Sequence, residues 1–223
     1  MSAAKIIPFK DRQPEAIIFD LGGVLLNIDM QRAIDEFRKL GFENAEDRIS
    51  SIFSRNSSDG AAGIFQLYET GQITSAQFRD GIREHSGRNL SDREIDGAWT
   101  AMLLDIPSEN LRLLEQLGKK YRLYMLSNTN AIHIETLTAS STGDTGFRGL
   151  VARFDKVYYS FHLKMRKPDV SIYNHVIDDA GLDPGTTLFI DDSAPNIEGA
   201  EEAGLMTYQH PRNAKLDGIF DSF

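Results

Sequence analysis

The sequence predicts an α/β fold in which a doubly wound parallel sheet carries a helical module inserted after its first strand. Short apolar runs alternate with helical patterns in the second half of the chain, which is typical of a parallel sheet covered by helices. The segment between residues 30 and 105 contains helical patterns and no β-branched run. We therefore expect a core made of residues 1–28 and 106–223, and a helical insertion at residues 29–105.

Four short apolar runs are expected to form buried strands, and a fifth run is a further candidate. Such runs, bounded by polar or turn residues, are typical of strands that helices cover on both faces. The expected strands are residues 16–19, 123–126, 156–159 and 187–190, with 206–209 as the fifth candidate.

Apolar residues at helical spacing predict three helices between the later strands. The first begins at Ser108, the second ends near Gly181 and the third ends at Gly204. Glycine is favoured just beyond a helix because it adopts the left-handed conformation without steric strain. The small and polar stretch at residues 140–149 is expected to be a loop.

The insertion is predicted to be helical throughout. Two capping boxes mark helix starts, because Thr74 is followed by Gln77 and Ser91 is followed by Glu94. In a capping box these side chains satisfy each other's free backbone N–H groups. The expected helices are residues 30–40, 45–53, 60–69, 75–84 and 92–104.

The composition limits the classes of function. A net charge of −9 over 223 residues argues against a nucleic-acid partner. The absence of cysteine excludes disulfides, thiolate catalysis and cysteine-bound zinc. No stretch approaches the roughly 20 apolar residues of a membrane span, and the first residues lack the apolar region of a secretory signal. We expect a cytoplasmic protein with no membrane partner, and a homodimer is one candidate for its oligomeric state.

Polar residues follow the ends of four expected strands. The carboxyl ends of parallel strands meet at one edge of the sheet, where open α/β proteins bind their ligands. We therefore expect these side chains to form one site. They are Asp20 after the first strand, Ser127 and Asn128 after the second, Lys167 a loop beyond the third, and Asp191 and Asp192 after the fourth.

These residue types suit phosphoryl chemistry that depends on magnesium. Carboxylate oxygens are ligands for Mg²⁺, and one carboxylate can act as a nucleophile that forms an aspartyl phosphate. A hydroxyl, an amide and an ammonium group can hold the phosphoryl oxygens and balance their charge in the transition state. Several carboxylates in one pocket would repel each other, and Lys167 together with Mg²⁺ would supply the opposing charge.

The four strand-end motifs resemble those of the haloacid dehalogenase-like hydrolase superfamily. They read Ile-Phe-Asp-Leu-Gly-Gly-Val, Leu-Ser-Asn-Thr, Lys-Met-Arg-Lys-Pro-Asp and Ile-Asp-Asp-Ser, in the order of that superfamily and over nearly the whole chain. The resemblance implies a Rossmann-like core with a helical cap. It also implies a Mg²⁺-dependent phosphohydrolase that uses an aspartyl-phosphate intermediate and acts on a small phosphorylated metabolite, with sugar phosphates as the candidate class.

The resemblance also assigns a role to each residue of the expected site. Asp20 matches the nucleophile and a ligand of Mg²⁺. Ser127, Asn128 and Lys167 match the residues that bind the phosphoryl group. The other Mg²⁺ ligands would be Asp191, Asp192 and the backbone carbonyl of Gly22.

Gly22 is the departure from the pattern, because phosphatases of this superfamily usually have Asp there as the general acid and base. Such catalysis contributes about 10²–10⁴-fold, so the reaction should be slow unless another residue substitutes, and Asp29 is near in sequence. Two alternatives stay open. One is a 2-haloacid dehalogenase, which uses the same nucleophile without a metal and has no use for the Asp191–Asp192 pair. The other is a catalytically impaired protein that binds a phosphoryl ligand or has a regulatory role.

Each residue also has a purely structural alternative. Ser127 could cap the helix that follows the second strand, and Asp191 or Asp192 could cap the helix after the fourth. Lys167 could be an exposed loop residue, with its neighbour Arg166 facing the site instead.

Overall fold

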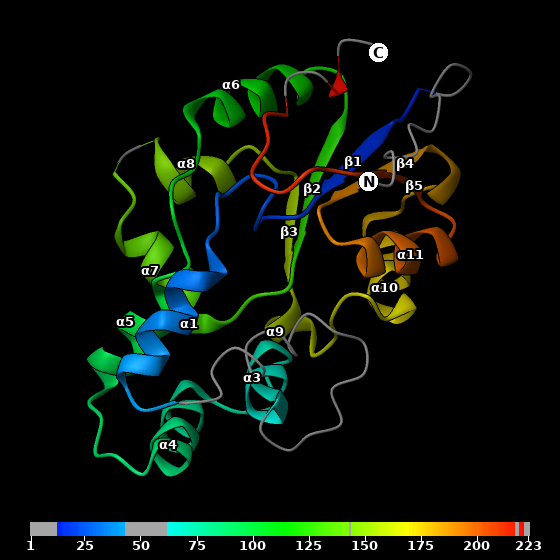
Figure 1. Cartoon of the computed structure of the whole chain (residues 1–223). Helices are drawn as coiled ribbons and strands as arrows, with labels where there is room; N and C mark the ends of the chain where they lie inside the picture. Colours follow the sequence, from blue (N-terminus) through cyan, green and yellow to red (C-terminus); the bar gives the residue numbers. More distant parts are fainter. Residues whose placement is uncertain (1–12, 43–61, 143, 217–218, 221–223) are drawn as a thin grey trace.

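A computed structural model describes residues 13–42, 62–142, 144–216 and 219–220 (Figure 1). The helix expected at residues 45–53 lies outside these ranges. Within them, no helix has the length and hydropathy needed to cross a bilayer.

The core is one sheet of five parallel strands, which confirms the predicted fold class. The first strand in sequence lies at the centre, and the order across the sheet is β3-β2-β1-β4-β5. After β1 the chain adds two strands on one side and then two on the other. The strands are β1 (Ala16–Phe19), β2 (Arg122–Ser127), β3 (Lys156–Tyr159), β4 (Thr187–Asp191) and β5 (Met206–Gln209).

Side chains alternate between the two faces of the sheet, and each face has its own apolar cluster. In β1, Ile17 and Phe19 belong to one cluster, and Ala16 and Ile18 belong to the other. This alternation follows from the two-residue repeat of a strand. All four residues are buried, so apolar side chains are required at consecutive positions.

Helices cover both faces (Figure 1). One of them, α8 (Gly146–Val151), corrects the expectation of a loop over residues 140–149. Phe147 and Leu150 pack into the core there, and this contact compensates for the weak helical tendency of the local sequence. The helices α6 (Ser108–Leu117), α7 (Ala131–Ala139) and α8 lie on one face, and α10 (Val170–Ala180) and α11 (Ala194–Glu202) lie on the other. The short segments are α9 (Ser160–Leu163) and the 3₁₀ turn η1 (Pro184–Thr186).

The described part of the segment between β1 and α6 is helical and has a separate apolar cluster. Four aromatic side chains, Phe37, Phe65, Phe78 and Trp99, lie at its centre in mutual ring contact. Both capping boxes are present, at Thr74 and at Ser91. The helices are α1 (Met30–Lys39), α3 (Ala62–Glu69), α4 (Ser75–Ser86) and α5 (Asp92–Thr100).

The last helix of this segment is shorter than predicted. It ends at Thr100 and not at residue 104, because the chain then pairs with the strand-like segment after β1. Leu103 forms an antiparallel bridge with Ile28, and the Leu104 N–H donates to the carbonyl of Asn27 over 3.0 Å. The incoming and outgoing chains therefore lie side by side, and these helices lie beyond the carboxyl ends of the strands (Figure 1).

Candidate active site

The strand register brings the predicted site residues together. Phe19, the last residue of β1, lies beside Met125 of β2 and Ile190 of β4. The Asp20 N–H donates to the carbonyl of Ile190 over 2.9 Å, which fixes Asp20 next to the end of β4. This position, where the chain changes sides of the sheet, is the usual ligand site of open α/β folds.

Lys167 is buried at the centre of the site, with 1% of its side chain exposed, so it is not a loop residue in solvent. Its Nζ lies 2.8 Å from Oδ1 of Asp20 and 2.6 Å from Oδ2 of Asp191. Asn128 holds the backbone of the lysine through two hydrogen bonds of 2.9 Å, one donated by its amide and one accepted by its carbonyl oxygen. Asn128 therefore positions Lys167, and it also lines the cavity described below.

The charges in this cluster are strongly coupled. Burial raises the pKa of Asp20 to about 7, and repulsion by Asp191 and Asp192 adds to this effect, while Lys167 opposes it. Burial disfavours the charge of Lys167, but the two carboxylates beside it raise its pKa above the ordinary value. The three carboxylates face the Lys167 ammonium and, at Asp192, the Arg212 guanidinium, which leaves excess negative charge that a bound cation would neutralise.

The donor set fits a magnesium ion. One carboxylate oxygen from each of Asp20, Asp191 and Asp192 lies within 4.8 Å of the others. All are oxygen ligands, which a hard divalent cation prefers. Asn196 holds the Asp191 carboxylate through amide hydrogen bonds of 3.0 Å to both oxygens, and the Arg212 guanidinium pairs with Asp192.

The residues proposed above as possible helix caps do not cap the helices that follow them. The N-cap of α11 is Ser193, so neither aspartate occupies that position. The N-cap of α7 is Asn130, whose side chain accepts from His133, so Ser127 does not cap the helix. Ser127 is instead buried and lines the cavity beside Asp20.

The two glycines of the first motif have different roles. Gly23 has φ of +81°, and a Cβ added there would lie 2.8 Å from Oδ2 of Asp192. Gly22 does not have a positive φ, and a Cβ there would meet only Ile28 at ordinary contact distances of 3.5 and 3.6 Å. The backbone therefore requires glycine at position 23 and accepts a side chain at position 22.

The Gly23→Ala variant should bind Mg²⁺ more weakly and lose about 1–2 kcal/mol of unfolding free energy, because left-handed backbone is strained for alanine. Gly87→Ala is the matched control: its φ is +63°, but nothing lies within 4 Å of an added Cβ. Thermal unfolding and Mg²⁺ titration should show strain in both variants and weaker metal binding only in Gly23→Ala. Unchanged metal affinity in Gly23→Ala would contradict the contact with Asp192.

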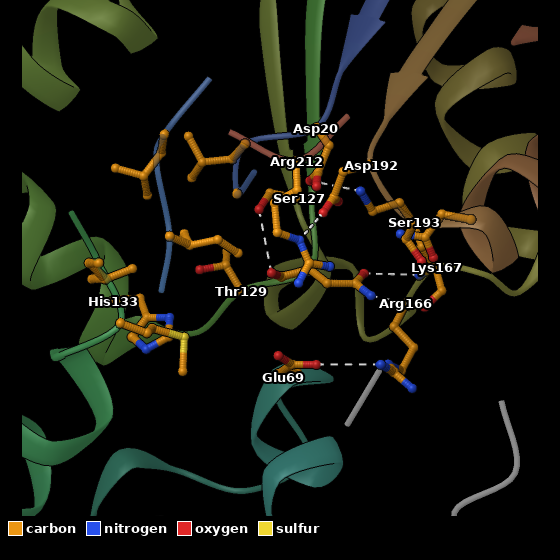
Figure 2. A pocket seen from close by; sticks show the side chains of 18 of the residues that line it. Asp20, Glu69, Ser127, Thr129, His133, Arg166, Lys167, Asp192, Ser193 and Arg212 are labelled. Atoms are coloured by element: carbon orange, nitrogen blue, oxygen red, sulfur yellow. Dashed lines mark hydrogen bonds and ion pairs between the residues drawn. The ribbon is translucent and has the colours of Figure 1, made fainter. Parts of the chain in front are cut away.

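The site opens into a cavity with about 890 Å³ of empty space, a volume that includes space open to solvent. Figure 2 shows Asp20, Ser127 and Asp192 at one end, and Glu69 near Arg166 at the other. Much of the cavity lining is apolar. The apolar lining residues include Leu26, Ile28, Met102, Leu103 and Leu137.

Arg212 and Glu69 line this cavity and are not part of any predicted motif. Arg212 lies in the segment after β5 and pairs with Asp192. Its position in the cavity depends on how the chain folds, and no sequence motif indicates it. Glu69 is the last residue of α3, where a negative charge is unfavourable for the helix dipole. That unfavourable placement is the one sequence feature that could have drawn attention to Glu69.

Asp29, the candidate near Gly22 in sequence, and the ionisable residue His133 both have structural roles. Asp29 is the N-cap of α1, where its side chain accepts from the Gln31 N–H over 3.0 Å, and it does not line the cavity. His133 lines the cavity, but its Nε2 lies 3.1 Å from the carbonyl oxygen of Trp99. Burial lowers the pKa of His133 to about 4, so this imidazole is neutral at pH 7.

Glu69 should make the stability of the protein depend on pH. Burial raises its pKa from 4.5 to about 7, despite the nearby Arg166 and Lys167. The folded state then binds this proton more tightly than the unfolded state, so the contribution of Glu69 to stability falls as pH rises from about 4.5 to about 7. In Glu69→Gln this titration is absent, and its Tm relative to wild type should rise across that interval. A difference in Tm that is constant with pH would contradict the raised pKa.

Comparisons with known proteins agree on one family. A model of the haloacid dehalogenase-like hydrolase family matches residues 14–204. The chain is 33% identical over 197 residues to a D-ribitol-5-phosphate phosphatase from Bacteroides thetaiotaomicron, covering 88% of this chain and 91% of the relative. It is 34% identical over 197 residues to a sesquiterpene phosphatase from Aspergillus oryzae, covering 86% and 87%.

A solved structure agrees with the sequence comparisons. A HAD family enzyme from Bacteroides thetaiotaomicron, in complex with magnesium and inorganic phosphate, superposes with a TM-score of 0.81. The two chains are 41% identical, and the match covers 93% of this chain and 99% of the other. The chain belongs to the haloacid dehalogenase-like hydrolase family.

Proposed function

We propose that this protein is a Mg²⁺-dependent phosphatase that acts on a small sugar or polyol phosphate through an aspartyl-phosphate intermediate. Its class, a phosphoric monoester hydrolase, follows from its family and from the phosphatases related to it. One observation carries the finer proposal: a buried lysine lies between Asp20 and Asp191 in the lining of the cavity.

The relatives support both the metal and the substrate class. One relative is a D-ribitol-5-phosphate phosphatase, and a structural neighbour holds magnesium with inorganic phosphate. In this chain the cluster of Asp20, Asp191 and Asp192 supplies suitable oxygen ligands, and the carbonyl of Gly22 would be a further one. When bound there, Mg²⁺ would neutralise negative charge on the phosphoryl group.

Each residue of the cluster would have its own role in the reaction. A carboxylate oxygen of Asp20 would attack phosphorus, and the bond from phosphorus to the ester oxygen would break. The Ser127 hydroxyl and the Lys167 ammonium would hold the phosphoryl oxygens as negative charge spreads over them. Asn128 fixes the backbone of Lys167 and so its position. Water would then release inorganic phosphate and restore the Asp20 carboxylate.

Gly22 supplies no proton donor for the departing oxygen. We expect solvent to deliver that proton, and turnover to be slower than it would be with an acid at position 22. The dehalogenase alternative is less consistent with the site, because that reaction needs no pair of metal-binding carboxylates beside the nucleophile.

The helical segment at residues 29–105 would act as a cap. Its helices lie beyond the carboxyl ends of the strands (Figure 1), and it contributes Glu69, Trp99 and Met102 to the cavity lining. A cap in this place would exclude water from the reacting atoms and contact the part of the substrate beyond the phosphate.

A panel of phosphate esters tests the proposal. With Mg²⁺ present, we expect phosphate release to be fastest from sugar and polyol phosphates, and slower from nucleotides and small phosphoacids. Halide release from 2-haloacids should stay at the rate without enzyme. Background rates across the phosphate panel would favour the non-catalytic alternative, and halide release would favour the dehalogenase.

An apolar phosphate ester is a second candidate substrate, and the cavity wall favours it. Leu26, Ile28 and Met102 would contact an alkyl chain, and one relative is a sesquiterpene phosphatase. Faster turnover of a long alkyl phosphate than of any polyol phosphate in the same panel would select this candidate.

A further inference from the structure

We propose that Glu69 and Arg166 form a subsite for a hydroxyl group of the substrate, at the end of the cavity remote from Asp20. The inference rests on the proposed phosphatase function and extends it, because it names the residues that select a polyhydroxylated leaving group. Figure 2 shows the two residues at the opposite end from the Asp20 cluster, so they would contact the leaving group and not the phosphate.

Glu69 has a buried carboxylate oxygen that accepts no hydrogen bond from the described residues. The Glu69 side chain lines the cavity and is 6% exposed, and this oxygen is its Oε2. Its position is fixed, because its backbone carbonyl accepts from the Ser160 hydroxyl over 2.6 Å. A buried polar atom without a hydrogen bond is costly, so its retention calls for a ligand or a bound water.

Arg166 is close enough to pair with Glu69 without satisfying that oxygen. Its Nη2 lies 3.6 Å from Oε2 of Glu69, which is beyond hydrogen-bond distance. Arg166 directly precedes Lys167, so the loop that supplies the phosphate-site lysine also supplies this charge. The pair thus joins α3 to the loop that holds the phosphate site.

The combination selects a neutral group that both donates and accepts. The paired charges of Glu69 and Arg166 leave no net charge at this end of the cavity, so neither an anion nor a cation is favoured there over a neutral group. An alkyl group would leave the buried Glu69 acceptor unsatisfied. A hydroxyl can donate to that oxygen and accept from the Arg166 guanidinium beside it, so the subsite fits the far end of a polyol or sugar phosphate and disfavours the apolar alternative. A site built to bind a hydroxyl discriminates strongly against an analogue that lacks it.

Binding to the Asp20→Asn protein tests the subsite without turnover. Calorimetry with Mg²⁺ would compare D-ribitol 5-phosphate with n-pentyl phosphate, which has the same chain length and no hydroxyl groups. We expect the polyol phosphate to bind roughly 10–100-fold more tightly, as a hydrogen bond to a charged group allows. Adding Glu69→Met should reduce this preference about tenfold or more.

Two further variants keep the test decisive. Glu69→Met with Arg166→Met removes both members of this pair, so it tests the subsite even if the single change destabilises the fold. Glu84→Met changes an exposed residue of α4 and should leave the preference intact. A preference for the polyol phosphate that persists in both Glu69 variants would overturn the subsite alone. Equal binding of the two ligands to the Asp20→Asn protein would do the same. Failure to bind either ligand would contradict the proposed phosphatase function itself.

Discussion

The Asp20→Asn variant should lose phosphatase activity by roughly 10⁴-fold or more, since loss of a nucleophile removes the covalent step. Asparagine has nearly the same shape, so the fold should persist, and removal of a buried negative charge relieves repulsion by Asp191 and Asp192. Phosphate release under saturating Mg²⁺, with circular dichroism as a check of folding, measures the effect.

The matched control is Asp29→Asn. Asp29 caps α1, and asparagine is an equally good N-cap, so this change removes a carboxylate outside the cavity with little effect on stability. It should retain wild-type turnover. A folded Asp20→Asn protein that keeps more than a tenth of the wild-type rate would show that Asp20 is not the nucleophile.

The Gly22→Asp variant should turn over faster than wild type, by about 10²-fold if the new carboxyl group reaches the leaving oxygen. The structure permits the change, because the backbone at Gly22 does not need positive φ and an added Cβ would lie in ordinary contact with Ile28. Steady-state kcat for a sugar phosphate at several pH values measures the gain.

Gly22→Asn separates proton transfer from simple occupation of space. It has the size of aspartate and cannot transfer a proton, so it should show no gain. An equal gain in both variants, or a gain in neither, would argue that the missing acid does not limit the reaction.

The central strands could be predicted because they are buried on both faces. Ile17, Ile18 and Phe19 are all buried, so the apolar run itself marks β1. The edge strands β3 and β5 are only partly buried, and they too have the predicted bounds. The Asp20 cluster could be predicted for a related reason: polar residues that follow parallel strands must meet at one edge.

Features that depend on contacts between distant segments could not be predicted. The helix α8 forms because Phe147 and Leu150 find a place in the core. Leu103 leaves the helical pattern because it pairs with Ile28. Glu69 and Arg212 enter the cavity only through the packing of α3 and of the segment after β5, and no motif surrounds either residue.

The central claim is that the three aspartates at this sheet edge hold a Mg²⁺ ion that the phosphatase reaction requires. Its most direct test is the initial rate of phosphate release from D-ribitol 5-phosphate by protein stripped with EDTA and then titrated with Mg²⁺. We predict background rates in EDTA and a saturable recovery with Mg²⁺ that Asp191→Asn weakens. An equal rate in EDTA and in Mg²⁺ would contradict the account.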